Sequence, residues 1–131
     1  MAYEYKILAV TTIFYLFAWF PSSVGKYHSY GWKWLSSNRN PVAGRELLPW
    51  AGRAERAYAN LKDYFPAFIA AILLLGINDK FDGATSCAAT IYLGARLLHL
   101  VAYIYGNVSI RFLGFLAGIV SNTFLLIKIF L

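Results

Sequence analysis

Two groups of polar residues interrupt otherwise apolar segments of this sequence. The first group is spaced by three, four and three residues: Arg53, Arg56, Asn60 and Asp63. The second is spaced by three and four: Arg96, His99 and Tyr103. Such intervals place side chains on one face of an α-helix. Charged residues inside membrane-spanning helices are energetically costly, so each of them there is a candidate functional residue.

The chemistry that these residues suit is the binding of a small anion. Cations outnumber the one acid on the two stripes, Asp63, because Arg111 joins the three arginines above. Guanidinium groups bind carboxylates through paired hydrogen bonds, whereas Asp63 and Asn60 would suit an amino or amide group. The pattern therefore predicts a site for a zwitterionic ligand with net negative charge. The alternative for any single residue is a structural one, in which Arg56 and Asp63 neutralise each other inside a helix bundle.

The composition indicates which elements must position these side chains. Of the 131 residues, 60% are hydrophobic, 18% aromatic and only 14% charged, against about 45–50% apolar and 25% charged in globular domains. A chain this short cannot bury so many apolar residues in one core. Disordered chains lack aromatic residues, and the single cysteine, Cys87, excludes a disulfide-stapled domain. The composition therefore predicts a membrane protein.

Four apolar segments predict an all-α, integral membrane four-helix bundle with up-down topology, forming a single domain over residues 1–131. The expected spans cover about residues 4–22, 53–77, 84–105 and 108–131. We interpret the first as a retained span because Trp19, Phe20 and Pro21 offer no small-residue site for signal-peptide cleavage. The second and third helices are antiparallel, so the start of one meets the end of the other. Both polar stripes are thus expected at the same end of the bundle.

The first connection, about residues 21–50, sets the expected orientation. It carries four cations against one acid, Glu46: Lys26, Lys33, Arg39 and Arg45. The positive-inside rule places this connection and the site in the cytoplasm, and both termini on the opposite side. Aromatic residues among these cations would also suit nucleic acid. We favour lipid headgroups, because the connection lies between two membrane spans. The two histidines, His28 and His99, lack metal-ligand spacing, so we expect no metal site.

Two sequence blocks carry a resemblance to a known family. Residues 56–68, RAYANLKDYFPAF, resemble the signature of the membrane-associated proteins in eicosanoid and glutathione metabolism, which reads Arg-Ala-x-x-Asn-x-x-Glu followed by Pro and Phe. Residues 95–103, ARLLHLVAY, together with Arg111, resemble the third helix and the start of the fourth in that family. Residues 48–54, LPWAGRA, resemble short bacterial members in particular. A bacterial inner membrane is the location that this similarity implies.

The resemblance implies a homotrimer that binds glutathione, as co-substrate, between neighbouring subunits. The positions that match glutathione-contacting residues of the family are Arg56, Asn60, Asp63, Tyr64, His99 and Tyr103. Arg96 matches an arginine on the third helix, and Lys26 would stand in for a basic residue at the end of the first. Arg111 matches the catalytic arginine that stabilises the thiolate. A guanidinium beside sulfur lowers the pKa of a thiol below its usual value of about 8.5.

The resemblance thus implies a membrane-bound glutathione transferase, or a peroxidase-like enzyme, that attacks a lipophilic electrophile arriving from the bilayer. The family's usual glutamate is replaced here by Asp63, as in its non-catalytic lipoxygenase-activating branch. The alternative is therefore a non-enzymatic lipid-binding scaffold, or an accessory subunit of a larger membrane complex. Phe112 stands where the prostaglandin synthase branch has a serine, which argues against that activity.

Overall fold

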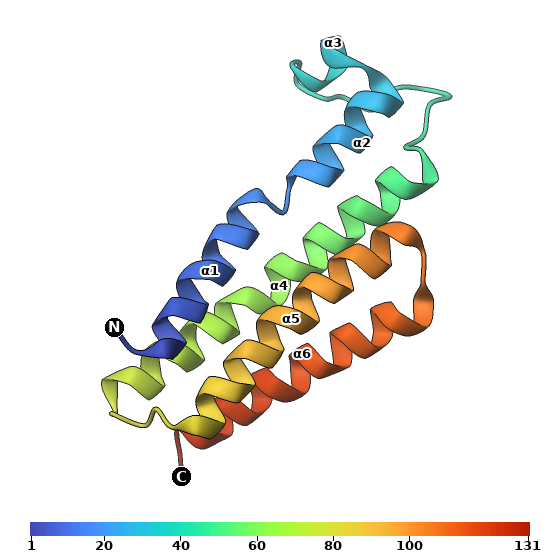
Figure 1. The fold of residues 1–131 in the computed structure, drawn as a ribbon. Coiled ribbons are helices and arrows are strands. Elements are labelled where there is room, and N and C mark those ends of the chain that lie inside the picture. Colours follow the sequence, from blue (N-terminus) through green and yellow to red (C-terminus); the bar gives the residue numbers. More distant parts are fainter.

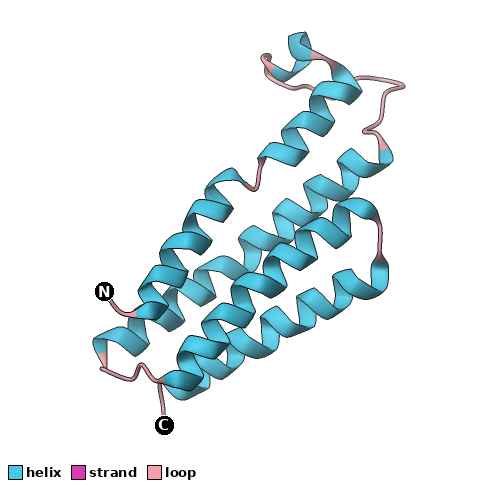
Figure 2. Ribbon diagram, in the orientation of Figure 1, coloured by secondary structure: helices cyan, strands magenta, loops and turns pink.

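The computed structural model describes all 131 residues, and every regular element in it is a helix (Figure 2). The helices are α1 (Tyr3–Phe17), α2 (Phe20–Tyr30), α3 (Trp32–Leu35), α4 (Pro49–Ile77), α5 (Gly83–Tyr105) and α6 (Val108–Lys128). Four segments are long and apolar enough to cross a membrane: Tyr3–Tyr30, Pro49–Ile77, Gly83–Tyr105 and Val108–Lys128. The predicted all-α class with four such helices is confirmed.

The first of these segments is interrupted where α1 gives way to α2. Pro21 has no N–H to donate to the carbonyl of Phe17, so the helical ladder cannot run through this point unbroken. The helix then resumes and continues to Tyr30, well past residue 22, where the first span was expected to end. Gly31, with a φ of 82°, turns the chain into the short helix α3. Figure 1 shows α3 lying across the far end of α2.

Local capping residues define the two tight connections between the later helices. The Asp82 side chain caps α5 by accepting from the backbone N–H of Thr85 at 2.9 Å, and the Thr85 hydroxyl in turn accepts from the backbone N–H of Asp82 at 2.8 Å. Gly106, with a φ of 82°, ends α5. The Asn107 side chain then caps α6 by accepting from the N–H of Ile110 at 3.0 Å. These caps fix α5 and α6 as neighbours that run back along each other (Figure 1).

Aromatic side chains join α1, α4 and α5 in the core. Phe68 stacks on Tyr92 with ring centroids 4.0 Å apart, and Tyr15 stacks on Phe65 at 4.1 Å. The hydroxyls of Tyr15 and Tyr92 lie 3.1 Å apart, so each buried phenol has a polar partner. The core is therefore held by stacked rings whose hydroxyls satisfy each other.

A buried carboxylate ties the beginning of α1 to the beginning of α5. Glu4 is only 2% exposed, and its Oε1 accepts hydrogen bonds from the hydroxyls of Thr85 at 2.7 Å and Ser86 at 2.8 Å. No helical pattern in the sequence singles out Glu4, which lies close to the start of the chain. Its contacts make it a clamp between the first and third spans.

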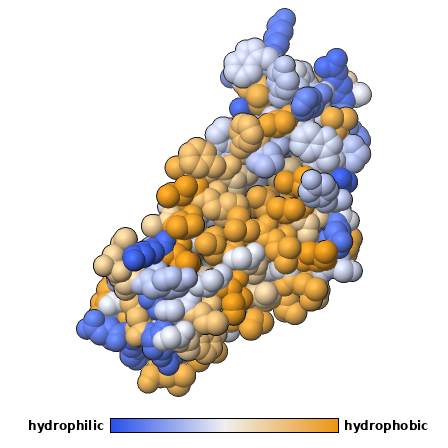
Figure 3. All heavy atoms as spheres, viewed as in Figure 1, coloured by the Kyte–Doolittle hydropathy of each residue, from blue (hydrophilic) through white to orange (hydrophobic).

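The face of the bundle seen in Figure 3 is apolar over its middle, with polar side chains gathered towards both ends. Less than half of each span is buried within the chain, and large side chains such as Ile77, Val101 and Val120 are exposed. A contiguous apolar surface of this kind must be covered in the cell. This distribution is what an integral, multi-pass membrane protein requires.

Candidate functional site

The two predicted polar stripes meet at Arg96, in the interior between α4, α5 and α6. Arg96 is 1% exposed, and its Nη2 donates to Oδ1 of Asn60 at 2.7 Å. Its guanidinium carbon lies 5.7 Å from the centre of the Tyr64 ring. The Nε and Nη1 atoms of Arg96 have no hydrogen-bond partner. A buried cation is thus satisfied on one side only, which is costly unless another group completes its coordination.

Two glycines on α6 make room for this arrangement. A Cβ atom at Gly118 would lie 2.9 Å from Cδ of Arg96, and one at Gly114 would lie 2.9 Å from the carbonyl oxygen of Ala95. Small residues four apart let membrane helices approach closely. The sequence analysis missed Gly114 and Gly118, although their four-residue spacing was the available signal.

Asn122 continues the same spacing on α6. It is 5% exposed, and its Oδ1 has no hydrogen-bond partner. Asn122 lies one helical turn beyond Gly118, the glycine against which the Arg96 side chain packs. The sequence analysis did not place it in the site. Unpartnered donors on Arg96 and an unpartnered acceptor on Asn122 thus occupy the same region of the buried α5–α6 contact.

The second stripe connects Arg96 to the beginning of α6. His99 is 2% exposed, and its Nδ1 lies 3.1 Å from the backbone carbonyl oxygen of Arg111. A carbonyl oxygen only accepts, so Nδ1 carries a proton, whereas Nε2 has no hydrogen-bond partner. The Arg111 guanidinium lies 4.6 Å from the centre of the Tyr103 ring. The structure therefore brings together His99 and Tyr103 of α5 and Arg111 of α6.

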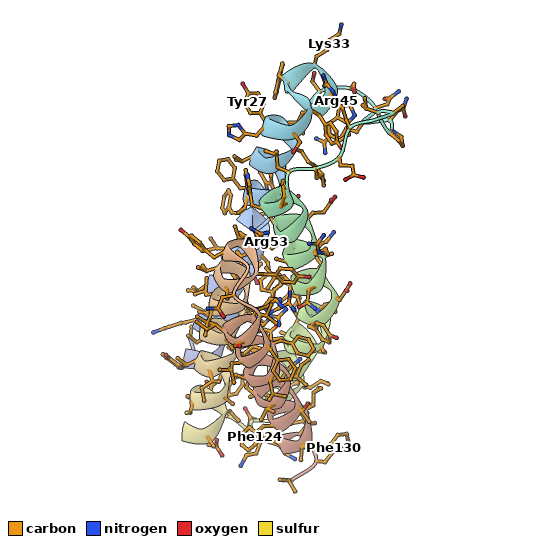
Figure 4. All side chains as sticks on the ribbon, turned by 90° about the vertical axis from the view of Figure 1, so that its right-hand side faces the viewer. Tyr27, Lys33, Arg45, Arg53, Phe124 and Phe130 are labelled. Atoms are coloured by element: carbon orange, nitrogen blue, oxygen red, sulfur yellow. The ribbon has the colours of Figure 1, made fainter.

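Arg53 has a structural contact instead. Its Nε donates to the carbonyl oxygen of Ile104 at 2.9 Å, so it caps the last turn of α5. Figure 4 shows Arg53 on α4 beside that end of the bundle. The sequence placed Arg53 on the same stripe as Arg56, but its guanidinium is engaged by backbone.

Arg56 and Asp63 are both exposed on α4, and neither is in an ion pair. The molecule has two ion pairs, Lys26–Glu55 at 2.9 Å and Lys128–Asp82 at 2.8 Å. The structural alternative predicted an ion pair between Arg56 and Asp63, and the structure does not contain it. The ammonium group of Lys26, another predicted site residue, is neutralised by Glu55.

Tyr64 belongs to an aromatic group beside the buried cation. Its ring is half-buried and lies 5.5 Å from that of Phe115, which in turn lies 6.2 Å from His99. These rings pack between α4, α5 and α6 next to Arg96. Apolar rings beside a cation lower the local dielectric, which strengthens an electrostatic interaction made there.

The charge of the molecule is concentrated at this end. Three cations and three acids lie in the half that holds the termini: Lys6, Lys80, Lys128, Glu4, Asp79 and Asp82. The formal net charge of +6 therefore lies entirely in the other half. Partly unsatisfied guanidinium groups in a positively charged region can hold a carboxylate or a thiolate. The donor set thus fits a small anion.

Comparison with known proteins places the chain in a family. A search of the curated proteins finds no match. The model of the MAPEG family, the membrane-associated proteins in eicosanoid and glutathione metabolism, matches residues 6–131, essentially the whole chain. The protein therefore belongs to the MAPEG family, as the resemblance of its two sequence blocks predicted.

Proposed function

We propose that this protein is a membrane-bound glutathione transferase with peroxidase-like capacity. The observation that carries the proposal is the incomplete coordination of Arg96 beside His99, Tyr103 and Arg111. Membership of the MAPEG family supports glutathione as the anionic ligand. The glutathione thiolate attacks a lipophilic electrophile to form a thioether, by addition or by displacing a leaving group. Alternatively it attacks the O–O bond of a lipid peroxide and releases the alcohol, and the resulting sulfenic acid condenses with a second glutathione to give the disulfide and water.

Arg111 is the residue to which we assign thiolate stabilisation. It is half-buried at the first turn of α6, and no carboxylate of the chain pairs with it. An unneutralised guanidinium stabilises a thiolate and so raises the thiolate fraction at neutral pH. Tyr103, against which Arg111 packs, holds it in position.

The remaining proposed roles concern the rest of the ligand. Arg56 binds a carboxylate and Asp63 binds the amino group, since both are exposed and free of partners within the chain. The other ligand-contacting residues are Asn60, Tyr64, Arg96, His99 and, from α2, Lys26. Lys26 would have to exchange its contact with Glu55 for the ligand.

We further propose that the protein is a homotrimer with its site between subunits. Arg56 and Asp63 are exposed on a helix that crosses the membrane, and charged groups there do not face hydrocarbon. A neighbouring copy would cover them and complete the site. The four spans would then run up and down across a bacterial inner membrane, with the +6 half and the site in the cytoplasm and both termini outside.

The decisive experiment uses the purified full chain in detergent. We expect glutathione to bind with a Kd in the millimolar range or below, and a model electrophile to be conjugated. Arg111→Ala should reduce turnover by about a hundredfold, in the range seen when one donor to a developing anion is removed. Lys6→Ala, which removes an exposed cation at the opposite end, should change neither quantity.

Two results would contradict parts of this proposal. Absence of glutathione binding would remove the transferase function altogether. Binding with turnover unaffected by Arg111→Ala would keep the function and remove our assignment of Arg111.

A second candidate function is a non-enzymatic lipid-binding scaffold. The observation that favours it is an apolar groove of about 440 Å³ between α5 and α6, lined by residues that include Ile91, Val120 and Phe124. Such a groove suits an acyl chain and involves none of the site residues above. Binding of a fatty acid without any glutathione binding would support this function over the first.

A further inference from the structure

The lengths of the helices place the connection between α2 and α4 beyond the hydrocarbon of the bilayer. Helices α5 and α6, of 23 and 21 residues, are about 35 and 32 Å long, close to the roughly 30 Å of a hydrocarbon core. The first segment, Tyr3–Tyr30, has 28 residues and spans about 42 Å, which matches core and headgroups together. Residues 31–48, here called the basic platform, therefore lie at headgroup level.

The basic platform is folded and is fixed to α2 by hydrogen bonds. Nε1 of Trp34 donates to the carbonyl oxygen of Asn40 at 2.8 Å, and the Ser29 hydroxyl accepts from the N–H of Leu48 at 3.0 Å. Arg39 donates to the carbonyl oxygen of Leu35 at 2.9 Å. The Tyr30 and Trp34 rings pack with centroids 4.5 Å apart. The side chains of the platform thus project from a structured surface.

Three cations project from this surface without a counter-charge. Lys33, Arg39 and Arg45 are exposed and in no ion pair, and Glu46 is the only acid of the platform. Figure 4 shows Lys33 pointing away from the bundle at its far end, with Arg45 on the same cap. The platform therefore presents an excess of positive charge where anionic headgroups would lie.

A hollow beside these cations is lined by exposed aromatic side chains. It has a volume of about 710 Å³, and its lining includes three aromatic residues, Tyr27, Tyr30 and Trp32, together with Arg45 and the one acid of the platform, Glu46. Trp32 is 67% exposed and Tyr27 is 49% exposed. Exposed tryptophan and tyrosine are favoured at the membrane interface, where one side of the ring is apolar and the other wet. The hollow thus offers a cation for a phosphate and rings for the adjoining glycerol and first methylenes.

We propose that the basic platform is a binding site for the headgroup of an anionic phospholipid. Arg45 binds the phosphate at the hollow, Lys33 and Arg39 add electrostatic attraction, and Trp32 inserts beside the lipid. A membrane lipid, rather than a soluble anion, is the ligand because both ends of the platform continue into spans and hold it at headgroup depth. This site shares no residue with the glutathione site proposed above.

The test titrates the full chain, in neutral detergent at low salt, with dioctanoylphosphatidylglycerol and with dioctanoylphosphatidylcholine, following tryptophan fluorescence. We expect saturable binding of the anionic lipid alone. Each of Lys33→Gln, Arg39→Gln and Arg45→Gln should weaken it about fivefold, and the three together about a hundredfold. Lys6→Gln, the matched loss of an exposed cation at the other end, should change it less than about twofold.

The position of the lipid is tested with the tryptophans themselves. Trp32→Phe should abolish the fluorescence change, whereas Trp19→Phe, at the break between α1 and α2, should preserve it. Equal binding of the zwitterionic lipid would overturn the proposal. An undiminished affinity for the anionic lipid in the single variants, which retain most of the platform's contacts and so keep its fold, would overturn it as well. Displacement by an equal concentration of inorganic phosphate, or of a short oligonucleotide, would show that the platform binds a different anion.

Discussion

Two buried charged side chains, Glu4 and Arg96, are stabilised to different degrees. Glu4 receives hydroxyl hydrogen bonds from two neighbouring residues of α5. Arg96 donates one hydrogen bond to a side chain, to the amide oxygen of Asn60, and two of its nitrogens have no hydrogen-bond partner. A buried ion is tolerable only when hydrogen bonds or a counter-ion replace its hydration. The carboxylate of Glu4 therefore has its hydrogen-bond donors within the chain. The guanidinium of Arg96 still lacks acceptors, and the chain itself does not supply them.

Asp82 gives a prediction about pH at the residue scale. The ion pair with Lys128 and the hydrogen bond from Thr85 hold the pKa of the Asp82 carboxyl below its usual value of 3.8. The ionised carboxylate thus stabilises the fold fully above about pH 3.8, and this contribution is lost as the pH falls through the lower folded-state pKa. We expect Asp82→Asn to make the midpoint of thermal unfolding in detergent less dependent on acid pH.

Asp79, in the same turn, provides the control for this experiment. It is exposed, is in no ion pair, and has a φ of 52°, which asparagine also tolerates. Asp79→Asn should leave the pH profile unchanged. If both variants follow the wild-type profile at acid pH, the contact between Asp82 and Lys128 does not contribute to stability.

At the scale of the elements, the packing of α5 on α6 positions the site. His99 reaches the carbonyl oxygen of Arg111 because Gly114 lets the two backbones approach. The added Cβ of an alanine at Gly114 would lie 3.0 Å from the backbone nitrogen of His99 and 2.9 Å from the carbonyl oxygen of Ala95. Backbone atoms cannot move aside as a flexible side chain would, so the helices themselves would have to separate.

We therefore expect Gly114→Ala to destabilise the protein by about 1–3 kcal/mol and to weaken glutathione binding. Gly94 on α5 is the matched control, because an added Cβ there meets nothing within 4 Å. Gly94→Ala should be neutral or stabilising by about 0.5–1 kcal/mol. Denaturation in mixed micelles measures both changes. A Gly114→Ala variant as stable as Gly94→Ala would mean that the close approach is not needed.

The four spans could be predicted from the sequence because lipid demands long apolar runs. The break between α1 and α2 could have been inferred from Pro21, and continuation of the helix into residues 26–35 was open from the sequence, but composition alone could not decide that the helix runs to Tyr30. Residues 21–30 are rich in serine, glycine and proline and resemble a loop in composition. Packing of Gly25 against α4 overrides that local preference.

The part of the candidate site that could be predicted is the set of residues that helical spacing places on one face of a helix. Intervals of three and four placed Asn60 and Arg96 on facing stripes, and the structure joins them by a hydrogen bond. Spacing on one helix says nothing about rotation relative to its neighbours, so it could not show that Arg96 is buried while Arg56 is exposed. It also could not show that Arg53 bonds to a backbone carbonyl.

At the scale of the whole molecule, a single chain leaves charged side chains without a counter-charge and apolar surface uncovered. The +6 half carries exposed Arg56 and Asp63 on a span, and less than half of each span is buried. Lipid can cover the apolar side chains but not the charged ones. A second copy of the chain can cover both, which is why the arrangement favours assembly.

We accordingly expect the protein in detergent to have a mass of three times 14.7 kDa, as measured by light scattering corrected for bound detergent. Asp63→Lys, which reverses a charge on the exposed face of α4, should shift the protein towards monomers. Asp79→Lys makes the same reversal outside the spans and should leave the trimer intact. A wild-type monomer at all accessible concentrations would contradict the proposed assembly.

The clamp formed by Glu4 also dictates an order of events during biosynthesis. A ribosome makes the first span before the third, so Glu4 reaches the membrane before Thr85 and Ser86 exist to donate to it. Until they arrive, the carboxylate must stay in water, because hydrocarbon offers it no partner. The first span can therefore settle to its final depth only after the third has been inserted beside it.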